Sequence, residues 1–173
     1  MKGGDVLRRQ FGLVYALVRA NTAGMDAEAS LVQPKPAGNC ANWVLGHLAA
    51  VHNAVMWLGN EAPVWDREEL SGPGKLPPVT GPGNALDWEE LTARFFASEE
   101  RCMAALGRLT EDDLDEGGFT DPFGTACTRG EFLTLLAVHQ LYHAGQLGTL
   151  RRIAGLDGAV KGPTEVPAGA RAV

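Results

Sequence analysis

The sequence has few cysteines and no long apolar run. Its three cysteines among 173 residues form no C-x-x-C pair, which excludes a disulfide framework and a thiolate zinc finger. No stretch approaches the roughly 18–20 apolar residues that a membrane span requires. We also expect no secretory signal peptide, because Arg8, Arg9 and Gln10 interrupt the segment that would have to be apolar. We therefore expect a cytoplasmic protein with no membrane partner.

The sequence also lacks a basic stripe. Its net charge is −6, and six acidic residues fall between Glu111 and Asp121. Acidic surfaces repel phosphate backbones, and no run of Lys and Arg offsets this repulsion. We expect no nucleic-acid partner.

Apolar periodicity predicts four helices, scored at about 100° per residue. The third and fourth begin with capping-box spacings, Asp87 with Glu90 and Thr128 with Glu131. The predicted helices run from near Asp5 to near Thr22, from an N-cap at Asn39 to Leu58, from Asp87 to Leu106, and from Thr128 to a stop at Gly155.

A Pro- and Gly-rich stretch at 59–85 separates the second and third helices. A connection of this length can carry the chain along the whole bundle, which predicts at least one pair of parallel neighbouring helices. The fold class expected is all-α, a four-helix bundle with long crossover connections. One domain covers 1–156, and the small, polar residues 157–173 form a loosely held tail.

Three of the four histidines lie on apolar helical faces. His139 and His143 are four residues apart, so their side chains leave the same face of the fourth helix one turn apart. Phe132, Leu136 and Leu150 fall within about 60° of them, which places both imidazoles in the middle of the apolar stripe. His47 lies at the centre of the second helix's stripe, whereas His52 is about 140° away and faces solvent or a neighbour.

These three histidines predict a metal site. A single histidine on an apolar face is more often a hydrogen-bonded core residue. Three neutral imidazoles in one small core, however, leave several polar nitrogens unsatisfied at about 1–3 kcal/mol each. One divalent transition metal held by His47, His139 and His143 satisfies all three, and zinc, nickel, copper and iron suit imidazole. Three protein ligands leave a position open, as in catalytic zinc sites.

The segment from His139 to His143 differs from the zincin peptidase motif H-E-x-x-H at its second position. Gln140 replaces the glutamate that serves as general base in zincins, and an amide cannot accept a proton in that way. The sequence therefore argues against a zincin peptidase.

Two segments, NWVLGHLAAVH and LLAVHQLYHAGQLGTLRR, resemble those of the DinB/YfiT-like metalloenzyme family (the DinB superfamily). The resemblance spans nearly the whole chain and implies a four-helix bundle with His47, His139 and His143 as ligands. It implies a divalent metal, nickel or zinc first, with iron, manganese or cobalt as other options. It also implies a homodimer, and relatives that are S-transferases for low-molecular-weight thiols such as bacillithiol or isomerases that depend on mycothiol.

Several neighbouring residues have two open interpretations. Gln146 and Glu99 either orient an imidazole or metal-bound water, or lie at the edge of an apolar stripe. Tyr142 and Trp43 are expected to wall the pocket, with Tyr142 a candidate donor to substrate. Cys40 and Cys102 are expected to be small core residues, and Asn42 and Arg129 are either carboxylate binders or solvated surface residues.

Two functional classes follow. In the enzyme class, which we favour, a small-molecule thiol is activated at the metal and attacks an electrophilic substrate, with Gln146, Tyr142 and Glu99 as candidate catalytic residues. A metal-dependent hydrolase is the variant, although no Asp or Glu is evident as its general base. The other class is a non-enzymatic, stress-related metal-binding protein.

A face of mostly small residues lies opposite the ligands on the fourth helix and can accept another helix closely. That helix belongs either to a second copy, which predicts a homodimer, or to the same bundle. The face consists of Ala137, Leu141, Ala144 and Gly148.

Overall fold

Helices make up most of this computed structural model, which describes residues 3–65 and 77–159. The elements are α1 (Gly3–Thr22), α2 (Ala27–Ser30), α3 (Ala41–Leu58), the 3-10 helix η2 (Pro82–Asn84), α4 (Trp88–Arg108), α5 (Glu111–Asp115), β1 (Phe119–Thr120), β2 (Ala126–Cys127) and α6 (Arg129–Ile153). The two short strands pair antiparallel, with Phe119 opposite Cys127.

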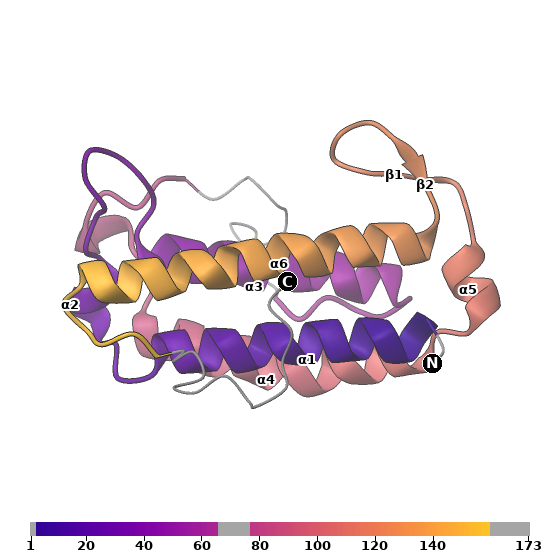
Figure 1. The fold of residues 1–173 in the computed structure, drawn as a ribbon, viewed down its shortest axis with the longest axis horizontal. Helices are drawn as coiled ribbons and strands as arrows, with labels where there is room; N and C mark the ends of the chain where they lie inside the picture. The colour runs from indigo at the N-terminus through magenta and orange to yellow at the C-terminus, as the bar shows by residue number, and fades with distance from the viewer. Residues whose placement is uncertain (1–2, 66–76, 160–173) are drawn as a thin grey trace, which may run out of the picture.

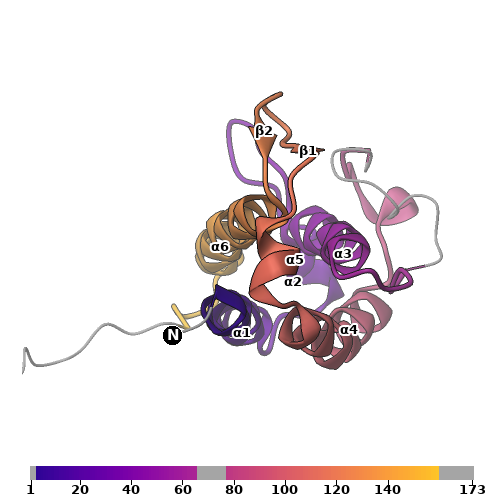
Figure 2. The same cartoon turned by 90° about the vertical axis from the view of Figure 1, so that its right-hand side faces the viewer.

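The four long helices form a bundle in which α3 and α4 are parallel neighbours (Figures 1 and 2). Trp88, at the start of α4, donates its indole N–H to the Met25 carbonyl just beyond the end of α1, at 2.7 Å. Arg129, at the start of α6, donates to the Leu58 carbonyl at the end of α3. Thus α1 and α6 run opposite to α3 and α4, and the all-α bundle with a parallel pair joined by the 59–85 connection is confirmed.

Side-chain caps define the starts of α4 and α6. The Thr128 hydroxyl accepts from the Glu131 backbone N–H, and the Glu131 carboxylate accepts from that of Thr128, so the predicted capping box is present. Asp87 likewise accepts from the Glu90 N–H at 2.8 Å. The predicted Asn39 cap is wrong by one residue, because Cys40 holds the extended cap position and makes no side-chain cap bond.

The small-residue face of α6 packs inside the bundle, against α1. Ala137 and Ala144 are fully buried, and the Asn21 amide donates to the Ala144 carbonyl at 2.9 Å. Gly148 permits this approach, since a Cβ there would lie 3.2 Å from Asn21 Nδ2. The predicted use of this face in a homodimer is therefore wrong, and the other interpretation, a neighbour within the bundle, holds.

The buried arc of α6 is rotated relative to the predicted stripe. Its fully buried positions include Leu133, Gln140 and Leu147, whereas Ile153 is exposed. His139 and His143 therefore lie at the edge of the buried arc rather than at its centre. The physical reason is that α6 packs against both α1 and α3, so its small residues and Gln140 are covered together with the leucines.

The ends of the 59–85 connection that the structure describes are tied to α3. The Asn42 side chain donates to the Leu86 carbonyl at 2.8 Å and accepts from the Leu86 N–H at 3.1 Å. Asn53 accepts from the N–H groups of Val64 and Trp65 at 2.9 and 3.1 Å. Residues 66–76 of the connection and 160–173 of the expected tail lie outside the described residues.

Candidate metal site

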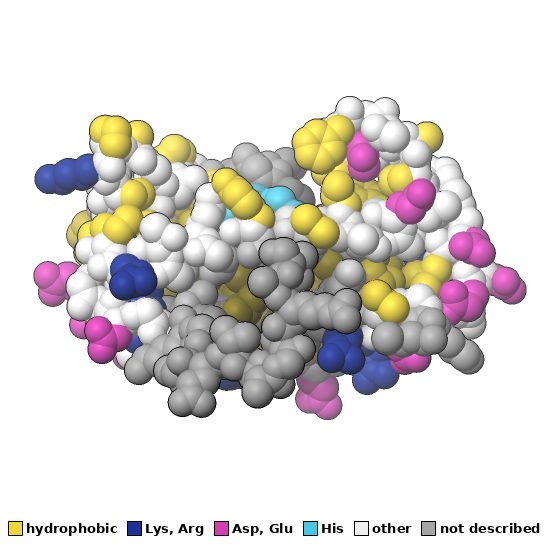
Figure 3. Space-filling model, viewed as in Figure 1, with side chains coloured by type: hydrophobic (Ala, Val, Ile, Leu, Met, Phe, Trp, Pro, Cys, Tyr) yellow, Lys and Arg dark blue, Asp and Glu magenta, His cyan; other side chains and the backbone are white. Residues whose placement is uncertain are grey.

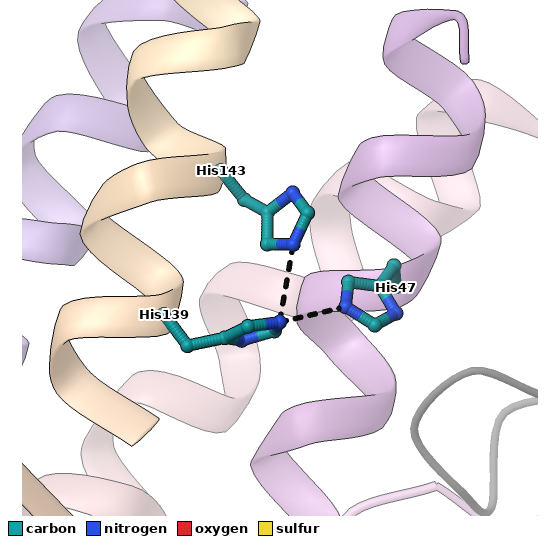
Figure 4. Close-up of side chains that lie close together, drawn as sticks. All are labelled: His47, His139 and His143. Carbon is teal, nitrogen blue, oxygen red and sulfur yellow. Dashed lines mark hydrogen bonds between the residues drawn. The ribbon is translucent and has the colours of Figure 1, made fainter. Parts of the chain in front are cut away.

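Three imidazoles from two helices converge on one point. His139 and His143 lie one turn apart on α6, and His47 faces them from α3 (Figure 4). His139 Nε2 is 3.1 Å from the Nε2 of both His47 and His143. Within the described ranges, no other group of three or more His, Cys, Asp or Glu side chains brings its ligand atoms this close together.

The spacing of these nitrogens fits a transition metal. Zinc binds imidazole nitrogen at about 2.0–2.1 Å, so two nitrogens at a tetrahedral centre are about 3.3 Å apart. The observed 3.1 Å separations are close to this value. The remaining nitrogens, Nδ1 of His47 and of His139, are buried and make no hydrogen bond to a described residue. The cluster can therefore hold a divalent metal through its three Nε2 atoms.

Burial keeps the three ligands neutral. Burial, with smaller contributions from the neighbouring His143 and His139, lowers the pKa of His47 from 6.5 to about 4. Burial followed by the proximity of His143 lowers the pKa of His139 to about 4 as well. The pKa of His143 is also lowered by burial, although its bond to Gln146 opposes this shift. Near neutral pH each imidazole thus has a lone pair available for a metal.

Gln146 fixes the orientation of His143. Its Oε1 lies 2.7 Å from His143 Nδ1, and an amide oxygen can only accept, so Nδ1 carries the proton. The lone pair of His143 is then on Nε2, which faces the other two imidazoles. Gln146 Nε2 in turn donates to the Tyr142 hydroxyl at 3.0 Å. The structure thus brings Gln146 and Tyr142, both selected from the sequence, to the histidine cluster.

Aromatic rings border the cluster on its open side. Trp43 stacks on His47 with ring centroids 5.0 Å apart and planes at 9°, and Tyr142 packs edge-on against His143 at 5.1 Å. Tyr142 is 64% exposed. Figure 3 shows histidine at the bottom of a hollow between two raised areas that are rich in apolar side chains. One flank of the cluster is thus open to solvent and the other is closed by the bundle.

Glu99 does not join the site. Its carboxylate pairs with Arg19 at 2.7 Å, linking α4 to α1 at the surface. No contact joins Glu99 to the histidines in the described part of the chain. The predicted apolar stripe of α4 is buried as expected, and Ser98 and Ala105 extend the buried arc on the side away from Glu99.

Asn42 and Arg129, considered as carboxylate binders or surface residues, are both buried and structural. Asn42 holds the connection to α4 as described above. Arg129 donates to the carbonyls of Leu58 and Asp113 and pairs with Glu116. The expected core positions of Cys40 and Cys102 are confirmed, and burial raises the pKa of the Cys102 thiol to about 11.

Two fully buried polar residues were not recognised as central from the sequence: His52 and Gln140. His52 packs against α4 and α1, so a neighbour covers it rather than solvent. The burial of Gln140 could have been predicted from helical spacing, since Leu136, Ala144 and Leu147 at i−4, i+4 and i+7 share its helical face.

Comparison with protein families places these features in a known group. A family model described as DinB superfamily matches residues 10–147, which include all three histidines. Comparison with curated proteins finds no match for this chain. Among the described residues, no helix is both long and apolar enough to cross a membrane. The family match covers most of the chain and agrees with the helical bundle and the histidine cluster, so this protein belongs to the DinB superfamily.

Proposed function

We propose that this chain is a metal-dependent thiol S-transferase that joins a low-molecular-weight thiol to an electrophilic small molecule, with zinc or nickel at His47, His139 and His143. The observation that carries the proposal is the three-nitrogen cluster with one open flank. Structural zinc sites are closed by four protein ligands, whereas catalytic sites keep three and leave a position for a reactant. A divalent cation held there supplies Lewis acidity, which lowers the pKa of a thiol.

The reaction joins sulfur to carbon. The thiol loses its proton, its sulfur forms a bond to the electrophilic carbon, and the bond from that carbon to its leaving group breaks. The leaving group takes the electron pair and, with the released proton, departs as its conjugate acid. With an epoxide, the proton ends on the opened ring oxygen.

The chain's own residues position the reactants. Gln146 keeps the lone pair of His143 directed at the cluster. Because the Tyr142 hydroxyl accepts from Gln146, its own proton is free to point elsewhere, and the exposed ring puts it at the open flank. We propose that Tyr142 donates to the departing group or the opened oxygen. Trp43 contributes an apolar wall beside His47.

A hydrolase is a weaker alternative on this geometry. Metal-dependent hydrolysis uses a carboxylate base beside the ligands, as in zincins. The cluster of close donor groups in the described residues contains histidines alone, and Glu99 is engaged by Arg19.

The test is a cobalt-loaded protein screened with thiols. Cobalt in place of zinc gives visible bands, and a bound thiol adds a sulfur-to-cobalt charge-transfer band. We expect such a band with one of bacillithiol, mycothiol, glutathione or cysteine, and conjugation of that thiol to an epoxide or chlorinated electrophile only when metal is present. If no thiol changes the spectrum, the transferase proposal fails while metal binding stands.

The Gln146→Ala variant tests the hydrogen bond that His143 Nδ1 donates to Gln146 Oε1. We expect turnover to fall by about 10–100-fold, the usual loss when the partner of a metal-bound histidine is removed. Thr149→Ala, at an exposed position of the same helix, is the control and should leave turnover unchanged. Equal turnover in Gln146→Ala and wild type would contradict the role given to this amide.

A further inference from the structure

Between the histidine cluster and the β1–β2 hairpin, helices α3 and α6 pack against each other. They run in opposite directions, so the residues after His47 on α3 and those before His139 on α6 both lead to the hairpin (Figure 1). In Figure 3 the hollow above the histidines is bounded by a raised area at the place where the hairpin projects from the bundle. Trp57 lies ten residues after His47, which at about 1.5 Å per residue gives this stretch a length of about 15 Å.

On α3, a small side chain lies between His47 and a large, exposed one. Ala54 follows His47 by seven residues and Trp57 follows it by ten, so the three side chains leave one side of the helix. Ala54 is half-buried, and Trp57 is 61% exposed. The Trp57 ring packs edge-on against Phe119 of β1, with ring centroids 5.8 Å apart. Trp57 and Phe119 therefore close the hairpin end of the stretch, and the single methyl group of Ala54 leaves room in front of them.

On α6, the positions that face the same stretch are also apolar. Leu135 and Phe132 precede His139 by four and seven residues, so they share its face of the helix. Both are half-buried, so neither is used up in packing the core. We call the side chains along this stretch the apolar groove: Ala54, Trp57, Phe119, Phe132 and Leu135.

The two helices that carry the apolar groove bring no charge to it. The sequence has no Asp, Glu, Lys or Arg in α3 or at positions 132–150 of α6. At the hairpin, Arg129 lies over the Phe119 ring at 5.2 Å and pairs with Glu116. The Asp121 carboxylate accepts from two backbone N–H groups of its own turn. These two charged groups are thus engaged, and the groove favours hydrocarbon over ionic ligands.

The hairpin is held in place by its own hydrogen bonds. Asp121 Oδ1 accepts from the N–H groups of Phe123 and Thr125 at 2.9 and 2.8 Å, and the Thr125 carbonyl accepts from the Asp121 N–H at 2.9 Å. Gly124 has a φ of 84°, which only glycine adopts readily. Phe123, in this turn, is 82% exposed. A fixed turn that exposes an aromatic ring beside the exposed Trp57 is typical of a binding surface.

Of the two reactants in the proposed reaction, the electrophile fits the apolar groove. Low-molecular-weight thiols such as bacillithiol and glutathione carry hydroxyl, amide and carboxylate groups, which would lose hydrogen bonds to water against apolar walls. An epoxide or alkyl halide with a hydrocarbon chain gains from the same burial.

We propose that the apolar groove binds the hydrocarbon part of the electrophile, so that the substrate is an uncharged small molecule with an alkyl chain or an aromatic ring, and that Ala54 determines how large this part can be. The inference rests on the proposed function for the identity of the reactants. The groove itself requires only the metal site beside it, so the two can be tested separately.

The first experiment measures binding without turnover. Alkyl hydroxamates, which bind a metal through two oxygens, are titrated into cobalt-loaded protein with the visible spectrum as readout, and the chain is lengthened from ethyl to butyl, hexyl and octyl. We expect the affinity of wild type to rise about fourfold for each added methylene, the factor that burial of one such group gives. Ala54→Leu should bind the ethyl compound as wild type does and the octyl compound about tenfold more weakly.

Ala97→Leu is the matched control, because it adds the same side chain at an exposed position of α4, which supplies none of the three histidines. It should follow wild type for every chain length. Trp57→Ala is the second variant, and since Trp57 is mostly exposed its removal leaves the core intact. It should also weaken binding of the octyl compound and not of the ethyl compound.

The second experiment measures turnover with the thiol that wild type accepts. We expect kcat/KM to be higher for an octyl epoxide than for an epoxide that carries a carboxylate, and Ala54→Leu to lose this preference through KM. Hydroxamate affinity that does not rise with chain length would overturn the proposal, and so would wild-type octyl affinity in both Ala54→Leu and Trp57→Ala. If no thiol reacts, the transferase proposal fails and the hydroxamate series still decides whether the groove binds hydrocarbon. A wild type that binds no cobalt would overturn the metal site and this inference together.

Discussion

Removal of His139 is the most direct test of the candidate site, because this residue is the centre of the cluster. Its Nε2 lies 3.1 Å from both other Nε2 atoms, while the three ligand atoms span up to 4.8 Å. In His139→Ala, only one ligand on each helix is left. Helices α3 and α6 then supply one imidazole each, and the third ligand of the proposed site is missing.

The expected loss can be worked out from ligand number. Structural zinc sites with four protein ligands bind with about 10–16 kcal/mol, which is about 3 kcal/mol per ligand. A loss of this size lowers the affinity by about two orders of magnitude. The fold should not suffer, because alanine favours the helix and relieves two close contacts between ring nitrogens. We therefore expect His139→Ala to lose metal affinity and to keep its helical content.

The assay is elemental analysis of untagged protein together with a chelator-competition titration, with far-ultraviolet circular dichroism as the folding check. Val138→Ala is the matched control, since Val138 is the adjacent residue on α6 and is exposed. It should keep the wild-type metal content and affinity. Full stoichiometric metal with wild-type affinity in His139→Ala would refute the assignment.

Three further outcomes follow from the structure. Gly148→Val should lower the free energy of unfolding by about 1–3 kcal/mol in urea titrations, because its Cβ would lie 3.2 Å from Asn21 Nδ2. Gly145→Ala is the control and should be neutral or stabilising, because a Cβ at Gly145 has no atom within 4 Å. Equal free energies of unfolding for the two variants would contradict this packing. Thr128→Ala should cost about 0.5–2 kcal/mol by opening the capping box, which the same titration measures. Metal-free protein should lose stability as the pH falls from about 6.5 to about 4. The pKa of His47 and of His139 is about 4 in the folded protein and 6.5 in the unfolded chain, so the unfolded chain binds more protons in that window. An unchanged urea midpoint between these pH values would show that the two pKa values are not lowered.

Predictions that depended on local spacing succeeded. The capping residues Thr128 and Glu131 are three residues apart in sequence, so their reciprocal bonds require only a helix start. His139 and His143 share a face in any α-helix, and the Gln146 side chain lies within reach of His143 one turn later. The histidine set could therefore be chosen from the sequence alone.

Predictions that depended on the direction of a helical face were less successful. Glu99 and Ser98 are neighbours in sequence, yet only contact with other helices decided that Ser98 is buried and Glu99 pairs with Arg19. For the same reason, Ala144 packs against α1 of its own bundle instead of a second copy.

The sequence by itself determined the four helices, the caps of α4 and α6, the long connection and the three histidines, because each depends on residues close together in the chain. Only the tertiary structure decided the rotation of each helix about its axis. Helical periodicity states how far apart two side chains point, about 100° per residue, but not toward which neighbour. That rotation is set by packing against two helices at once, which is why the burial of His52 and Gln140 became evident only in the assembled bundle.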